Sequence, residues 1–320
     1  MNQYNPDSSI KEFLDNHDVM DSSRKVYRYT VNYFFRWMVD TGRDPVHPSR
    51  ADIIAYKAYL KEHRTPNTVG LYVSSVKSYF RWLSDTGLYD NISRGIKTIS
   101  RIHTYAKDPL TIEDIQKLLT LPRQSIIDHR DHLILSLMYH NGLRIIEVSR
   151  LKYRDINLNR KEVWIQGKGR DVHECIAING SVIQAIEDYT QAKIDNDILI
   201  DDDDYLVTAH ACRSKRGRQF SPRDISALVS NRLKAAGLKT KRITGHSLRH
   251  SAAVHMINEG KFDLYAVQLF LRHKDSNKTR IYTRYAEKVK MQNNQPTNFL
   301  EGYLNSTASQ KVNNKSNHLL

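Results

Sequence analysis

The sequence predicts a mainly α-helical fold in two domains, with a small β-hairpin in the second. Three observations support this fold class. The chain has 320 residues, a length that fits two ordinary domains. Apolar residues recur at helical spacing through residues 1–90 and again through most of the chain after residue 110. Only residues 163–178 alternate apolar and polar side chains as a half-buried hairpin does.

The first domain, residues 1–90, is expected to contain four helices. The second helix has Ser22 and Ser23 as candidate caps, and the fourth begins with Pro66, which suits a first helical position. The expected helical segments, in order, are 7–14, 22–37, 53–60 and 66–83.

A short internal repeat lies in this domain. The residues FRWMVDTG at 35–42 recur as FRWLSDTG at 80–87. Each copy ends in a glycine where the chain would leave a helix, which indicates two related helical hairpins. Two copies are too few for a solenoid. We expect the aromatic residues to form a core rather than stack on bases.

Residues 91–109 have a different character and are interpreted as a basic interdomain linker. They show little periodicity and carry the candidate DNA-contacting residues Arg94, Lys97, Arg101 and Lys107. An ordinary exposed loop and a segment lying along a phosphate backbone are both compatible with this composition.

At the C-terminal end, residues 289–320 are polar and rich in Asn and Ser, which predicts a flexible tail. Its apolar island at 299–304 could dock on a partner.

The second domain, residues 110–288, is expected to be α+β. A capping signal at 111–114 opens it, and an apolar helix at 130–139 stops at Asn141 and Gly142. A new helix begins near Arg144. The hairpin follows, with a basic tip at 166–170 that carries Lys168 and Arg170. Further helices are expected at 181–193, 221–236, 244–259, 263–271 and 278–287.

The charge balance points to a polyanionic partner. The chain carries 49 Lys and Arg against 35 Asp and Glu, a net charge of +14, and both halves of the chain are basic. Nucleic acid is the expected partner, before an anionic membrane, although a merely basic protein would look similar.

No apolar run could span a membrane, and no secretory signal is visible. Two cysteines cannot build a disulfide framework, so we expect a reducing cytoplasm.

Basic, imidazole and phenol side chains are spread through the second domain in a suggestive order. Glu147 follows Arg144 by three residues, and His246 and Arg249 lie three residues apart on one expected helix. Each alone would be unremarkable, because a surface arginine or a core tyrosine is common. The ordered set is Arg144, Lys168, His246, Arg249, His273 and Tyr282.

This ordered set resembles the tyrosine recombinases, the family of phage integrases and chromosome-dimer resolvases. The matching stretches are NGLRIIE at 141–147, GKG at 167–169, HSLRH at 246–250, LRH at 271–273 and TRIY at 279–282. The resemblance covers about residues 8–288. It implies a SAM-like helical core-binding domain followed by the α+β catalytic domain of the family. The family often has glycine before the last histidine, where this chain has Arg272, which restricts the local backbone.

The resemblance and the chemistry of a phosphodiester agree on the roles. Arg144 and Arg249 would clamp the non-bridging oxygens, which gain negative charge during the attack. Tyr282, preferred over the nearby Tyr285, would attack phosphorus and form a covalent link. Lys168 would protonate the leaving 5′ oxygen.

The remaining candidates would assist these groups. His246 and His273 would bind the phosphate or move the tyrosine proton, and Glu147 would orient a neighbouring cation. No metal, ATP or other cofactor is expected, because the arginines supply the positive charge.

The resemblance implies site-specific recombination of double-stranded DNA through a 3′-phosphotyrosyl intermediate and a Holliday junction. It implies a dimer on each specific core site and a tetramer on two paired sites. Integration, excision, resolution and inversion all remain open, and accessory factors cannot be named. A type IB topoisomerase and a non-catalytic DNA-binding protein are the alternatives.

Overall fold

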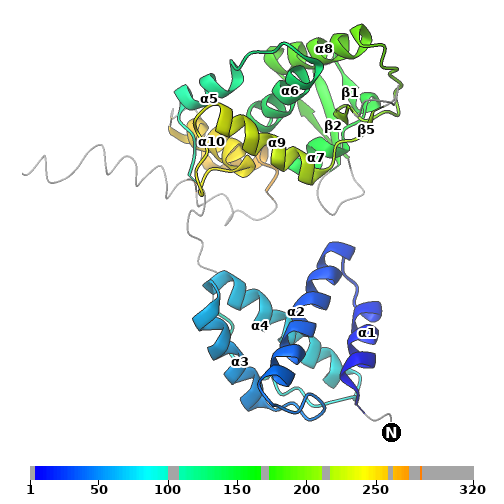
Figure 1. Cartoon of the computed structure of the whole chain (residues 1–320), viewed down its shortest axis with the longest axis vertical. Coiled ribbons are helices and arrows are strands. Elements are labelled where there is room, and N and C mark those ends of the chain that lie inside the picture. The colour runs from blue at the N-terminus through cyan, green and yellow to red at the C-terminus, as the bar shows by residue number, and fades with distance from the viewer. Residues whose placement is uncertain are drawn as a thin grey trace, which may run out of the picture. The chain divides into compact units, whose positions relative to one another are not determined.

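The computed structural model describes residues 4–99, 108–166, 173–210, 217–258, 262–273 and Tyr282. The chain divides into two compact units, Met1–His103 and Thr104–Leu320 (Figure 1). Each unit has its own hydrophobic core. The described residues are mainly helical with small antiparallel sheets, which confirms the predicted fold class. The exact boundaries of the linker and tail stay predictions.

The first unit is a helical bundle whose core is aromatic. Phe34, Tyr56 and Phe80 are fully buried, as the core interpretation of the aromatic residues requires, while Tyr29 stays 61% exposed. Because ring edges and faces attract, these side chains pack at T-shaped and tilted angles. The helices, all expected from the sequence, are α1 (Pro6–Asn16), α2 (Asp21–Asp40), α3 (Arg50–His63) and α4 (Pro66–Asp85).

Local sequence signals fix most of the helix ends in this unit. Ser49 and Asp52 form a reciprocal capping box at the start of α3. Gly42 and Gly87, which close the two repeats, both take the left-handed conformation expected after a helix, with φ of +69° and +71°. The predicted serine cap of α2 is wrong. That helix begins at Asp21, and Met20 at the N-cap provides no side-chain hydrogen bond.

Residues 91–99 lie along α3 and α4. The Nζ of Lys57 donates a 2.5 Å hydrogen bond to the carbonyl of Lys97, and Arg50 donates to the carbonyl of Arg94. Ile96 is buried in the aromatic core. The side chains of Arg94 and Lys97 remain exposed, so their charges face solvent. The other two basic candidates of this stretch, Arg101 and Lys107, lie outside the described residues.

The second unit combines helices with a small sheet at one side of them (Figure 1). In the three-stranded sheet β1-β2-β3, β2 and β3 form the predicted antiparallel hairpin, with Val163 opposite Ile176. Its tip, with Lys168 and Arg170, lies outside the described residues, as does the helix expected at 278–287. The strands are β1 (Ile156–Asn157), β2 (Glu162–Gln166), β3 (His173–Ala177), β4 (Thr208–Ala209) and β5 (Arg218–Gln219).

The α-helices of this unit match the sequence prediction within a few residues, whereas the short 3₁₀ helix at Tyr153–Asp155 was not predicted. Capping boxes at Thr111 and Ser125 define the starts of α5 and α6. Helix α6 is buried on most sides because α8 and α10 pack against it. The helices are α5 (Ile112–Leu119), α6 (Ile126–His140), α7 (Ile145–Arg150), η1 (Tyr153–Asp155), α8 (Gly180–Asp195), α9 (Pro222–Ala235), α10 (Gly245–Asn258) and α11 (Leu264–Phe270).

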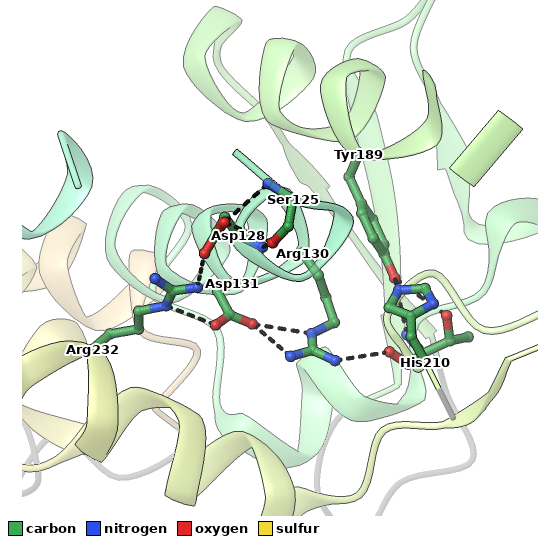
Figure 2. Close-up of polar contacts among 8 residues, drawn as sticks. Ser125, Asp128, Arg130, Asp131, Tyr189, His210 and Arg232 are labelled. Atoms are coloured by element: carbon green, nitrogen blue, oxygen red, sulfur yellow. Dashed lines mark hydrogen bonds and ion pairs between the residues drawn. The ribbon is translucent and has the colours of Figure 1, made fainter. Parts of the chain in front are cut away.

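A buried ionic network joins α6 to α9 and to β4 (Figure 2). Arg232 on α9 donates to Asp131 at 2.7 Å and to Asp128 at 2.6 Å. Arg130 pairs with the other oxygen of Asp131 and donates to the carbonyl of Thr208. Since each buried charge has a partner, the network can hold these elements together without an uncompensated ion.

Within the described ranges, no helix is both long and apolar enough to cross a membrane.

Candidate active site

The turn between α6 and α7 brings the first predicted site residue into place. Gly142 has a φ of +56°, and a Cβ there would lie 2.8 Å from the ring of Phe270. Only glycine satisfies both the left-handed backbone and this close approach. The turn leaves Arg144 at the N-cap of α7, with its side chain partly exposed.

Arg144 is held by the buried Glu147. Its Nη1 donates to Oε1 of Glu147 at 2.6 Å, and its backbone N–H donates to Oε2 at 2.8 Å. Glu147 is only 1% exposed. Burial raises the pKa of this carboxyl, but the charges of Arg272 and Arg144 outweigh burial and lower the pKa below its usual value. Glu147 is therefore an ionised anchor, as the expected supporting role requires.

Arg249 reaches the same place from α10. Its guanidinium donates to the carbonyls of Gly142 and Leu271, and the residue is 5% exposed. The Nη2 of Arg144 lies 3.4 Å from the carbonyl of Leu271. The two predicted arginines therefore converge on one backbone oxygen. Burial and the charge of Arg144 lower the pKa of Arg249 to about 9, so the group is still cationic at pH 7.

Tyr282 packs on α10 and α11, near enough to both arginines for their charges to act on its hydroxyl. It is 1% exposed and belongs to a small apolar cluster with Val254, Val267 and Leu271. Its hydroxyl oxygen lies 2.6 Å from Nδ1 of His250. Burial raises the pKa of Tyr282 to about 12, although the charges of Arg249 and Arg144 oppose this shift.

The two predicted histidines are placed differently with respect to Tyr282. The ring of His273, just after α11, is stacked with that of Tyr282 at 6.4 Å between centroids and an interplanar angle of 13°. His246 is exposed in the first turn of α10, on the same helix as Arg249 as expected. Lys168 lies outside the described residues, so its role stays a prediction.

Sequence reasoning assigned no role to two residues of this site. His250 contacts the tyrosine hydroxyl, and burial with the charge of His246 lowers its pKa to about 4. Its position four residues after His246, which places the two histidines on one helix face, was the available signal. Arg272 was treated only as a backbone departure, yet its guanidinium pairs with Glu147 at 2.9 Å.

This arrangement is suited to phosphoryl transfer. Two arginines can stabilise the charge that develops on phosphate oxygens, and a phenol next to a neutral imidazole can act as a nucleophile with a base. Among the residues that the structure describes, no group of three or more His, Cys, Asp or Glu could hold a metal ion. Fold and site together define a strand-transferring enzyme with a tyrosine nucleophile.

Comparisons with known proteins agree with this class. The phage integrase family matches residues 109–288, and the N-terminal SAM-like domain of phage integrases matches residues 8–90. The tyrosine recombinase XerD of Listeria innocua is 30% identical over 274 residues, which cover 81% of this chain and 86% of that protein. The tyrosine recombinase XerC of a Roseiflexus species is 30% identical over 283 residues, covering 86% and 87%.

A solved structure supports the fold independently. The site-specific recombinase XerH, in a post-cleavage complex with a palindromic difH substrate, superposes with a TM-score of 0.70. The superposition covers 89% of this chain and 83% of that one at 16% identity, so it bears on the fold alone. The chain belongs to the phage integrase family, the tyrosine recombinases, which are enzymes that cut and rejoin DNA. This assignment confirms the recombinase prediction and favours it over the topoisomerase and the non-catalytic protein.

Proposed function

We propose that this recombinase cuts a specific core site in duplex DNA with Tyr282 and conserves the broken bond as a 3′-phosphotyrosyl link. The observation that carries the proposal is the convergence of three groups. Arg144 and Arg249 approach the carbonyl of Leu271, and the Tyr282 hydroxyl lies beside these charges, 2.6 Å from His250. A scissile phosphate placed there would meet a clamp and a nucleophile together.

The proposed cleavage step balances as follows. Nδ1 of neutral His250 accepts the phenol proton as the oxygen of Tyr282 forms a bond to phosphorus. The bond from phosphorus to the 5′ oxygen breaks, and Lys168 gives that oxygen a proton. Arg144 and Arg249 stabilise the pentacovalent phosphorane through charge-assisted hydrogen bonds. Rejoining reverses each transfer with a 5′ hydroxyl from the partner duplex.

His246 and His273 complete the proposed site. His246 is exposed at the start of α10, where a phosphate bound by Arg249 would be within reach of an imidazole one turn away. His273 flanks the tyrosine ring and would keep the phenol in line. The reaction needs no metal or nucleotide cofactor in this proposal, because the arginines carry the compensating charge.

The assembly we propose has a dimer on each core site and a tetramer on two paired sites, with a Holliday junction as intermediate. The exposed side chains of Arg94 and Lys97, together with Arg101, Lys107 and Arg170, would contact DNA phosphates. The tail at 289–320 would dock on a neighbouring protomer through residues 299–304. Deleting residues 290–320 should then weaken strand exchange, and unchanged exchange would rule the docking out.

The compartment we propose is the cytoplasm, where DNA is accessible to such an enzyme. Whether the biological outcome is integration, excision, resolution or inversion depends on how the sites are arranged.

The test starts from sites selected by binding of the full chain to random duplex DNA. Nicked suicide duplexes of those sites should trap a covalent protein–DNA adduct, and pairs of intact sites should exchange strands. Relaxation of supercoiled DNA without site preference would instead indicate topoisomerase chemistry. Site binding with no adduct on any nicked duplex would contradict the proposed cleavage.

A further inference from the structure

Arg272 occupies an unusual backbone position in the site. It follows α11 with a φ of +51°, a conformation that a side chain with a Cβ rarely adopts. Two other described non-glycine residues share this conformation, Lys161 and Asp197, and both are exposed. The side chain of Arg272 is instead only 5% exposed. A buried residue held in an unfavourable conformation needs contacts that fix it there.

The contacts of Arg272 use both of its terminal nitrogens fully. Nη1 donates to the carbonyls of Asn141 and Phe270 at 3.1 and 3.0 Å. Nη2 donates to the carbonyl of Gly142 at 3.0 Å and to Oε2 of Glu147 at 2.9 Å. These four acceptors match the four hydrogens on the two nitrogens. The fork of Nη1 and Nη2 therefore joins the α6–α7 turn to the end of α11 and has no hydrogen left for a phosphate, while Nε is buried without a hydrogen-bond partner.

The contact with Glu147 affects how Arg144 is oriented. Oε1 of Glu147 accepts from Nη1 of Arg144, while Oε2 accepts from the backbone of Arg144 and from Arg272. With Oε2 occupied, Arg144 cannot close a two-pronged pair with this carboxylate. Its Nη2 has only a long contact of 3.4 Å to the carbonyl of Leu271. This nitrogen can therefore exchange the carbonyl for a phosphate oxygen as its hydrogen-bond acceptor.

We propose that Arg272 is a positioning residue that keeps Arg144 available to the scissile phosphate by engaging Glu147. The positive charge of Arg272 also offsets the negative charge of the buried Glu147 carboxylate. The positive charge of Arg144 is then less compensated and attracts the substrate phosphate more strongly. Without Arg272, both terminal nitrogens of Arg144 would bind the carboxylate of Glu147 and would be turned away from the phosphate. This inference rests on the proposed function and adds a residue that acts on the phosphate through Glu147 and Arg144.

The test measures single-turnover cleavage of nicked suicide duplexes, at sites selected by binding of the full chain. Arg272→Gly relieves the backbone conformation and removes the fork, so it should cut about 100-fold more slowly. Binding of the uncut duplex should stay within about twofold of wild type, because the terminal nitrogens of Arg272 are engaged within the protein. Arg272→Lys keeps the charge without the fork and should lose about tenfold. Lys161→Gly is the matched control, an exposed cation with φ of +55°, and should cut like wild type.

A double-mutant cycle separates positioning from general support of the fold. In a Glu147→Gln background the carboxylate charge is gone, so Arg272→Gly should cost less than about threefold. An equal loss in both backgrounds would overturn the proposal, as would wild-type cleavage by Arg272→Gly. If Arg272→Gly does not fold, the same cycle with Arg272→Lys decides. Absence of any adduct from the wild-type chain would instead contradict the proposed function itself.

Discussion

The hydroxyl oxygen of Tyr282 lies 2.6 Å from Nδ1 of His250, and the environment moves the two pKa values in opposite directions. Burial raises the pKa of the phenol to about 12 and, with the charge of His246, lowers that of the imidazole to about 4. At neutral pH both groups are therefore uncharged. In the proposed reaction the proton passes to His250 as the phenol oxygen bonds to phosphorus, and the charges of Arg249 and Arg144 favour this transfer because they lower the pKa of the phenol.

This pair predicts the pH dependence of cleavage. Because the pKa of His250 lies near 4, its imidazole remains a proton acceptor from pH 6 to 8, and the single-turnover rate should not depend on its titration there. The rate should fall when His250 is protonated on acidification towards pH 4. His250→Asn keeps an acceptor near the hydroxyl but provides no base, so it should cut about 100-fold more slowly. His255→Asn, on the same helix, is the control, and equal losses in the two variants would contradict the role of His250.

The arginine clamp predicts that charge alone is insufficient. Arg249→Lys keeps a cation but cannot reach the carbonyls of Gly142 and Leu271 together, so the phosphate clamp loses its geometry. Single-turnover cleavage should fall by about 100-fold or more, with duplex binding nearly unchanged. Gel-shift and suicide-cleavage assays on the same preparation separate the two effects. Full cleavage by Arg249→Lys would show that this guanidinium is only structural.

The buried network of Figure 2 predicts a stability effect away from the site. Asp131→Asn leaves Arg130 and Arg232 without their shared carboxylate, in a place where Asp131 is only 8% exposed. The free energy of unfolding should fall by about 3 kcal/mol. Asp203→Asn removes an exposed carboxylate that pairs with Arg154, and should cost less than about 1 kcal/mol. Urea unfolding of both variants checks this, and equal losses would contradict the account.

The same network predicts how stability depends on acid. Burial tends to raise the pKa of Asp128, but hydrogen bonds from Ser125 and Arg232 outweigh it and lower the pKa to about 2, from an ordinary 3.8. Its stabilising contribution is therefore present above pH 4 and is lost as the pH falls towards 2. The stability difference between wild type and Asp128→Asn should shrink over that range in urea titrations. A difference that stays constant down to pH 2 would mean that the carboxylate is not specifically stabilised.

Much of the fold could be predicted because its signals are local. Helical spacing, capping residues such as Thr111 and the glycines at 42, 87 and 142 act within a few residues of themselves. The strands β1, β4 and β5 could not be predicted. A strand of two residues is too short to show an alternation of apolar and polar side chains, and its pairing depends on partner residues elsewhere in the chain. The start of α2 was misplaced because a serine pair resembles a cap whether or not it forms one.

The residues of the candidate site also divide into those that the sequence predicts and those that only the structure shows. Residue types in family order predict Arg144, Arg249 and Tyr282 as site residues; the two arginines meet at the carbonyl of Leu271, and their charges act on Tyr282. The roles of His250 and Arg272 depend on side-chain directions at the end of α11 and on α10, which spacing alone does not determine. A histidine next to Arg249 in sequence could equally have faced the core.

The identity of the residue that carries the covalent DNA tests the central claim most directly. Adducts trapped on nicked selected sites would be digested with protease, and the nucleotide-bearing peptide would be sequenced by mass spectrometry. The account predicts that the nucleotide is on Tyr282, that Tyr282→Phe forms no adduct, and that Tyr285→Phe forms adducts normally. A nucleotide on another residue, or adducts that persist in Tyr282→Phe, would contradict it.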